Sequence, residues 1–164
     1  MSSPRQILTY LKNYFDKKDY VKYKKFKALV TSGPTREYLD PVRYISNESS
    51  GKQGYEVALA LNRLGVKTTL ITGPASQKLN SRELNIKKIT TAKEMMNEVL
   101  KTLPVDVAVC AAAVSDFKPK YKSKNKIKKS SNDSKIIQLE KNLDILSYLD
   151  KNNKNRPKVV VGFS

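Results

Sequence analysis

A run of serines and glycines between residues 46 and 54 could bind a phosphate group. It reads Ser46-Asn47-Glu48-Ser49-Ser50-Gly51-Lys52-Gln53-Gly54 and precedes a segment with helical periodicity. Backbone N–H groups and the positive end of the helix dipole favour an anion at such a helix start. Gln53 stands where a Walker loop needs Ser or Thr, and the GxGxxG spacing of dinucleotide-binding proteins is absent. A serine-rich helix cap with a solvated lysine is the alternative interpretation.

Small residues at the end of an apolar run form a second candidate site. Ala111-Ala112-Ala113 lead into Val114-Ser115-Asp116-Phe117, so a flat ligand could lie against the backbone there. Asp116 could accept hydrogen bonds from a base or ribose, or help to hold Mg²⁺. The alternative is close helix–sheet packing in which Asp116 only starts a turn.

A lysine-rich segment follows, with no acidic residue in it: Lys118, Lys120, Lys122, Lys124, Lys126, Lys128 and Lys129. Too few apolar residues accompany these lysines to pack, so we expect a mobile flap that could close over a polyphosphate. A solvated charge run and non-specific attraction to nucleic acid are alternatives that composition does not separate. Arg36, Arg43 and Lys52 could neutralise phosphates near the same place.

The composition excludes several kinds of site. The 164 residues contain no His and a single Cys, which excludes histidine-dependent triads, most zinc sites and an intramolecular disulfide. We expect Cys110 to be a small buried strand residue and not a nucleophile. The net charge of +17 points to anionic partners, although a Lys- and Asn-rich composition along the whole chain also explains it. The chain has no apolar run of membrane-spanning length and no signal pattern, so we expect a cytoplasmic protein.

Strands and helices that must position these residues alternate along the chain. The pattern predicts helices over 3–15, 51–64, 91–103 and 142–149, and strands over 26–31, 66–72, 105–114, 136–139 and 158–163. Residues 16–25 are expected to form a basic linker, and residues 35–50 a long loop. The strands over 105–114 and 158–163 are apolar enough to be buried on both faces.

This order predicts an α/β fold: a Rossmann-like, doubly wound, mostly parallel sheet with flanking helices. Ligands bind beyond the carboxyl ends of the strands in such sheets. We therefore expect one crevice to collect Ser32–Pro34, Gly73–Pro74, Ala113–Asp116 and Phe163.

Seven short segments, taken in order, resemble one known family. They are Val30–Glu37, Leu39–Asn47, Ser49–Gly54, Ala112–Phe117, Lys126–Lys129, Asn142–Leu146 and Val161–Phe163. The family is that of phosphopantothenate–cysteine ligases, the ligase half of the bacterial bifunctional flavoprotein of coenzyme A synthesis. The resemblance divides the chain into an N-terminal helix and linker, residues 1–25, and a CTP-binding ligase domain, residues 26–164.

The resemblance implies a reaction in two steps. The carboxylate of 4′-phosphopantothenate attacks the α-phosphate of CTP in the presence of Mg²⁺, and the amine of cysteine then displaces CMP. Positioning and charge stabilisation can supply most of such catalysis, which suits a chain without histidine. The flavin-binding half is missing, so no FMN is expected. Members dimerise through this domain, so a homodimer is possible.

The resemblance also assigns roles to residues. Asn47 matches an asparagine that holds the acyl-cytidylate, Arg43 an arginine required nearby, and Lys126 a flap lysine that reaches the intermediate. The remaining positions match the nucleotide pocket and the phosphate and substrate loops: Ala113, Asp116, Leu143, Asp144, Ile145, Leu146 and Phe163 for the first, and Gly33, Ser50 and Gly51 for the second.

Two departures from the family pattern leave alternatives open. Asn142-Leu143-Asp144-Ile145 stands where the family has Asn-Pro-Asp-Ile, which loosens a loop. The family also continues beyond Gly162-Phe163 with a lysine-bearing helix and further strands, so we expect an incomplete C-terminus. A non-catalytic remnant or partner subunit is therefore the alternative function. A nucleic-acid-binding protein is a third interpretation, but no known nucleic-acid motif supports it.

Overall fold

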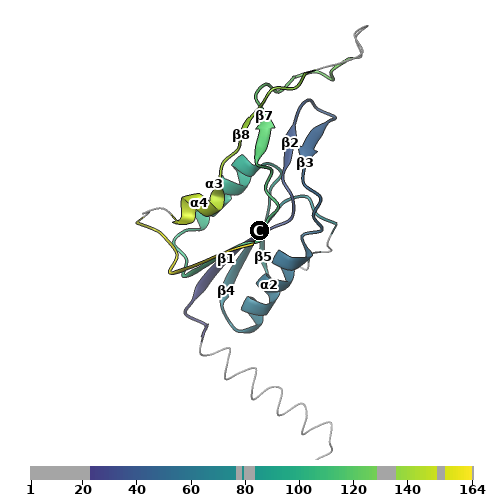
Figure 1. Cartoon of the computed structure of the whole chain (residues 1–164). Helices are drawn as coiled ribbons and strands as arrows, with labels where there is room; N and C mark the ends of the chain where they lie inside the picture. Colours follow the sequence, from purple (N-terminus) through teal and green to yellow (C-terminus); the bar gives the residue numbers. More distant parts are fainter. Residues whose placement is uncertain (1–22, 77–78, 80–83, 129–135, 151–153, 164) are drawn as a thin grey trace, which may run out of the picture.

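A computed structural model describes residues 23–76, 79, 84–128, 136–150 and 154–163. Its centre is a five-stranded sheet in the order β5-β4-β1-β6-β9, and every neighbouring pair is parallel (Figure 1). The strands are β1 (Lys27–Ser32), β4 (Lys67–Thr72), β5 (Asn85–Lys88), β6 (Val107–Cys110) and β9 (Val159–Gly162). The predicted parallel α/β sheet is confirmed, whereas the predicted helix over 3–15 and residues 16–22 of the linker lie outside the described residues.

Helices cover both faces of this sheet, as a doubly wound fold requires (Figure 1). On one face, α2 (Lys52–Arg63) packs Tyr55, Ala58 and Leu59 against Val30 and Leu70. The other face is covered by α3 (Ala92–Thr102) and α4 (Ile145–Asp150), whose core members are Met95, Met96, Val99, Ile145 and Leu149. Each large side chain fully buried in these layers stabilises the fold by about 1.5–3 kcal/mol. No helix in the described part of the chain has the length and apolar character needed to cross a membrane.

The ends of two helices follow the signals in the sequence. Gly65 closes α2 at φ +88°, and its N–H donates to the Asn62 carbonyl at 2.9 Å. Thr91 and Glu94 form a capping box at the start of α3, where the predicted helix over 91–103 begins. The predicted helix over 142–149 starts later in the structure, because α4 begins at Ile145 and Asp144 accepts the Ser147 N–H at 2.8 Å. Asn142 is instead engaged with the neighbouring strand end.

Two short hairpins extend from the carboxyl edge of the sheet. The predicted loop over 35–50 contains antiparallel strands β2 (Arg36–Tyr38) and β3 (Tyr44–Ser46). The predicted strand over 136–139 lies at β8 (Leu139–Lys141), which pairs with β7 (Phe117–Pro119) at the start of the lysine-rich segment. β2 packs beside β7, so the two hairpins form one projection (Figure 1). Strands of three residues carry too little alternation to be read from sequence.

The prediction that the strand over 158–163 is buried on both faces is wrong. Val159 and Val161 of β9 are 49% and 39% exposed. β9 is the edge strand next to β6, and no described strand pairs with its outer side. The apolar run therefore predicted a parallel strand correctly, but it did not indicate that this strand lies at the edge of the sheet.

Candidate active site

A cavity lies at the carboxyl edge of the sheet, where the order of strands reverses. From β1 the chain adds β4 and β5 on one side, and it then returns to add β6 and β9 on the other. Beyond the carboxyl ends of β1 and β6 is a pocket of about 600 Å³, whose wall begins with Thr31 and Cys110. A topological switch point of this kind is where parallel α/β sheets bind ligands.

Four separate segments bring predicted residues into this pocket. Its lining includes Asn47, Ala113, Asp116, Leu143, Asp144, Ile145, Leu146 and Phe163. The expectation that Gly73–Pro74 share the same crevice is wrong, because they line a separate cavity of about 420 Å³. They follow β4, which lies two strand spacings, about 10 Å, from β6.

Hydrogen bonds from both sides fix the strand end at Ala111–Asp116. The N–H of Ala113 donates to the Gly33 carbonyl at 2.9 Å, and that of Ser115 to Thr35 Oγ1 at 3.1 Å. Asn47 Nδ2 donates to the Val114 carbonyl at 3.1 Å. The Asn47 carboxamide oxygen accepts no hydrogen bond from any described residue, so it is available to a ligand. A rigid wall thus carries one polar group that faces solvent.

The opposite wall combines an apolar rim with a capped helix. Asn142 Nδ2 donates to the Ser115 carbonyl at 3.1 Å, and the Asn142 N–H donates to the Asp116 carbonyl at 2.7 Å. These bonds tie the start of α4 to the first wall. Leu143, Leu146 and Phe163 are each between 40% and 49% exposed. Apolar side chains left open beside polar backbone suit the flat face of a nucleobase.

Two carboxylates border the pocket. Asp144 uses Oδ1 to cap α4, whereas the exposed Asp116 carboxylate makes no hydrogen bond or ion pair with a described residue. The described residues contain no cluster of three or more potential metal ligands. Mg²⁺ usually takes one or two carboxylates together with substrate phosphates, so Asp116 fits a magnesium–nucleotide complex better than a protein-only cage.

The expected phosphate loop packs tightly against β1. Gly33 and Gly51 adopt φ +69° and +71°, a conformation that side chains other than glycine rarely take. Ser32 Oγ donates to the Gly51 carbonyl at 2.8 Å, and Ser50 Oγ accepts the Lys52 N–H at 3.3 Å. Gly33, Ser50 and Gly51 are thus together at the start of α2, but they are not among the residues that line the main pocket.

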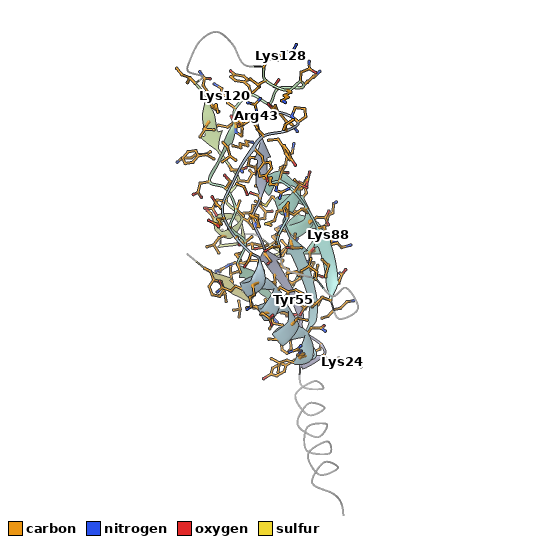
Figure 2. All side chains as sticks on the ribbon, turned by 90° about the vertical axis from the view of Figure 1, so that its right-hand side faces the viewer. Lys24, Arg43, Tyr55, Lys88, Lys120 and Lys128 are labelled. Carbon is orange, nitrogen blue, oxygen red and sulfur yellow. The ribbon has the colours of Figure 1, made fainter. Side chains whose placement is uncertain are left out.

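Arg43 and Lys126 lie near each other, and neither of them lines the pocket. Arg43 Nη2 forms an ion pair with Asp40 Oδ2 at 2.7 Å and donates to the Ile127 carbonyl at 2.5 Å. Figure 2 shows Arg43 near Lys120 and Lys128 at the hairpin end of the molecule, far from Tyr55 of α2. Lys126 is exposed and directly precedes Ile127.

The lysine-rich segment has more anchors than its composition suggests. The Ser123 N–H donates to the Leu39 carbonyl at 2.8 Å, and the Lys120 N–H to the Gln138 carbonyl at 3.0 Å. Lys122 Nζ lies 5.2 Å from the centre of the Tyr38 ring, within reach of a cation–π contact. Backbone hydrogen bonds and one aromatic ring hold this segment in place of apolar packing, which is the only kind of anchor that the sequence pattern reveals. Lys129 lies outside the described residues.

The model of the DNA/pantothenate metabolism flavoprotein C-terminal domain matches residues 23–164. The chain belongs to this family. It is 42% identical over 159 residues to the coenzyme A biosynthesis bifunctional protein CoaBC of Borreliella burgdorferi, a match covering 96% of this chain and 40% of that protein. It resembles the crystal structure of the C-terminal domain of CoaBC with a TM-score of 0.68 and 33% identity, over 84% of this chain and 63% of that one.

A second solved member is the DNA/pantothenate metabolism flavoprotein from Streptococcus pneumoniae, with a TM-score of 0.68 and 28% identity over 82% of this chain and 67% of that one. The family indicated by the sequence motifs is confirmed, and so is the Rossmann-like fold. The chain spans about 40% of the length of its curated relative from Borreliella burgdorferi.

Two residues of this flavoprotein C-terminal domain were not assigned roles from the sequence. One is Asn142, which clamps the strand end as described above. The other is Asp40, whose side chain is fully buried and whose Oδ1 accepts the N–H groups of Val42 and Arg43, both at 2.8 Å. An Asp that hydrogen-bonds the backbone two or three residues ahead is a known turn signal, and Asp40-Pro41 carries it.

The charge state of Asp40 follows from these contacts. Burial alone would raise the pKa of its carboxyl, but the hydrogen bonds that it accepts, first that from the Ile127 N–H, hold the pKa well below its usual range. Cys110 shows the opposite effect, because burial raises the pKa of its thiol to about 11. A thiol of this kind stays protonated at neutral pH, which agrees with the expectation that it is not a nucleophile.

Proposed function

We propose that this domain joins 4′-phosphopantothenate to cysteine in coenzyme A synthesis, in a reaction that consumes CTP. The observation that supports this most is the pocket at the switch point of the sheet. It has a rigid polar wall carrying Asn47 and Asp116 and an apolar rim of Leu143, Leu146 and Phe163. That arrangement suits a nucleotide whose base lies on the rim and whose α-phosphate faces the polar wall.

The proposed chemistry has two bond exchanges. In the first, a carboxylate oxygen of 4′-phosphopantothenate attacks the α-phosphorus of CTP, and pyrophosphate leaves. In the second, the amine of cysteine attacks the acyl carbon, and CMP leaves with the oxygen that joined it to the acyl group. The carboxylate is already a nucleophile at neutral pH, so positioning and charge stabilisation carry the catalysis.

Each proposed role rests on a position in the site. The free carboxamide oxygen of Asn47 would orient the acyl-cytidylate. The small side chain of Ala113 would leave room for the nucleoside, and Ile145 would border it. Magnesium, bound through CTP phosphates with Asp116 beside it, would neutralise charge on the leaving pyrophosphate. The exposed Ser50 would meet a phosphate at the start of α2, and the buried Gly33 and Gly51 would shape the loop around it. No flavin takes part, and association of two copies stays a prediction.

Arg43 and Lys126 would hold a second anionic group of the reactants. Arg43 and Asn47 are joined by strand β3, and at about 3.3 Å per residue their Cα atoms lie roughly 13 Å apart. 4′-Phosphopantothenate is an extended molecule with its phosphate and its carboxylate at opposite ends. One reactant could therefore contact both residues.

The test is pyrophosphate release from CTP and 4′-phosphopantothenate, with Mg²⁺ and without cysteine. We expect release that requires phosphopantothenate and falls about 100-fold in Asn47→Ala, in line with the loss of one preorganised polar contact to a reacting group. Asn85→Ala is the matched control, because Asn85 is an exposed asparagine of β5 whose Nδ2 donates to Thr69 Oγ1 at 3.1 Å, outside the pocket. Its rate should equal that of the wild type.

Release that is the same in both variants would contradict the role of Asn47. Folded protein that binds CTP but releases no pyrophosphate, beside an active full-length CoaBC protein, would favour the alternative of a nucleotide-binding unit that needs a further polypeptide. Protein that neither binds CTP nor releases pyrophosphate would refute the proposed function.

A further inference from the structure

One buried carboxylate contacts two segments that are far apart in the chain. Asp40 lies in the turn between β2 and β3, and its Oδ2 accepts the Ile127 N–H at 3.1 Å across 87 positions of sequence. The same oxygen accepts from Arg43 Nε at 3.0 Å. The carboxylate is therefore the shared acceptor of the hairpin turn and the lysine-rich segment.

Arg43 closes this contact from the other side. Its Nη2 bridges the Asp40 carboxylate and the Ile127 carbonyl, so the guanidinium is fixed to both segments. Its other terminal nitrogen, Nη1, makes no hydrogen bond with a described residue. The carbonyl that holds the guanidinium belongs to Ile127, which directly follows the exposed Lys126. A fixed guanidinium with a remaining donor, next to this lysine, provides a directional group and a point charge for one anion.

Removal of Asp40 would affect more than local stability. Without the carboxylate, the Ile127 N–H loses its acceptor and Arg43 loses the partner that fixes its orientation. The lysines between 124 and 128 would keep their charge but lose their place relative to Arg43. A cluster of mobile cations attracts anions weakly and without direction, whereas a preorganised cluster binds them without a further loss of conformational freedom.

We propose that Asp40 is a positioning residue that assembles Arg43 and the lysine-rich segment around Lys126 into one anion-binding unit. The choice of ligand, a phosphate group of CTP or of 4′-phosphopantothenate, rests on the proposed function. Asp40 itself touches no reactant. It acts through the hydrogen bonds by which it orders the two cationic segments.

The experiment compares Asp40→Asn with Asp106→Asn. Asp106 is a matched carboxylate at the opposite end of the sheet, where it accepts the Lys27 N–H at 3.0 Å and pairs with Lys158 at 3.3 Å. It lies outside the proposed machinery, so it reports the effect of losing an anchored Asp in general. Two quantities are measured for each full-length variant: amide hydrogen exchange of peptides covering residues 120–128, and affinity for inorganic pyrophosphate.

In Asp40→Asn we expect faster exchange confined to residues 120–128 and affinity for pyrophosphate reduced about tenfold or more. In Asp106→Asn both quantities should stay within about twofold of the wild type, since losses there are local. Arg43→Lys serves as a second probe of exchange if Asp40→Asn does not fold. It keeps the charge but cannot bridge Asp40 and the Ile127 carbonyl, so it should show the same local increase.

Equal exchange and equal pyrophosphate affinity in both Asp variants would overturn the proposal, as would a wild-type protein that does not bind pyrophosphate. The proposed function fails separately. Pyrophosphate binding that depends on Asp40, in a protein that never releases pyrophosphate from CTP, would remove the ligase proposal and leave the anion-binding unit in place.

Discussion

Gly54 is the residue at which the position of α2 depends most directly on the absence of a side chain. A Cβ at this position would lie 2.6 Å from Ser32 Cβ and 2.9 Å from the Thr31 carbonyl oxygen. Ser32 has little freedom to move away, because its Oγ donates to the Gly51 carbonyl. The close approach of α2 to β1 therefore needs glycine for space.

We predict that Gly54→Ala destabilises the protein by about 1–2 kcal/mol. The clash of an overpacked contact costs about 1–3 kcal/mol, and the better helix propensity of Ala returns up to about 1 kcal/mol. The free energy of unfolding in urea measures the change. Gln53→Ala, at the exposed neighbouring position, should stay within about 0.5 kcal/mol of the wild type. A stabilised Gly54→Ala variant would mean that α2 does not approach β1 this closely.

Residue types in the sequence indicated much of the pocket but not its organisation. Asp116 was a candidate because it follows small residues at the end of an apolar run, whereas the role of Asn47 came from the resemblance to phosphopantothenate–cysteine ligases. The hydrogen bond between Asp40 and the Ile127 N–H could not be found in this way. Every residue except proline has a backbone N–H, so residue type does not mark this donor, and Ile127 lies 87 positions from Asp40. The same limit hid the role of Asn142, whose amide clamps the Ser115 carbonyl.

At the scale of elements, α3 has the best-defined start. The side chain of Thr91 accepts the Glu94 N–H at 3.2 Å, and the Glu94 carboxylate accepts the Thr91 N–H at 3.3 Å. Helix α3 packs Met95 and Val99, both fully buried, into the core on one face of the sheet. Weakening the start of α3 would therefore loosen the packing of Met95 and Val99 and lower the stability of the core.

Thr91→Ala should lower the free energy of unfolding by about 1 kcal/mol, the usual effect of losing a side-chain N-cap. Thr102→Ala in the last turn of the same helix is the control. Thr102 Oγ1 donates to the Glu98 carbonyl at 2.7 Å, a contact that adds little to helix stability, so the change should stay within about 0.5 kcal/mol. Equal effects in thermal or urea unfolding would argue against the capping role.

Elements with strong periodicity or clear caps were predictable, and short or edge elements were not. The helical pattern over 51–64 predicted α2, and the pattern over 91–103 predicted α3. β2 and β3 were missed because three residues cannot show alternation and Pro41 suggested a loop. β9 was assigned to the interior because Val159–Val161 are apolar, although an edge strand can be apolar when its position depends on pairing with β6 alone.

At the scale of the whole molecule, strand order decides where ligands can bind. Alternating strands and helices predicted a parallel doubly wound sheet, and the general rule for such sheets placed the crevice at its carboxyl edge. The rule alone could not predict that the pocket beside β6 and the cavity beside β4 are two different cavities. The net charge of +17 fits anionic reactants, but the hairpin end that carries Arg43 and the lysine-rich segment was visible only in the structure (Figure 2).

The central claim is that a carboxylate of the substrate attacks the α-phosphorus of CTP in this pocket. We would measure it with 4′-phosphopantothenate labelled with ¹⁸O in both carboxylate oxygens, CTP, Mg²⁺ and cysteine. Because the bridging oxygen stays with CMP when the amine attacks the acyl carbon, the account predicts CMP that carries one ¹⁸O, detected by mass spectrometry. CDP together with ¹⁸O in orthophosphate would mean attack at the γ-phosphorus, and unlabelled CMP together with ¹⁸O in pyrophosphate would mean attack at the β-phosphorus. Either result would contradict the proposed attack at the α-phosphorus.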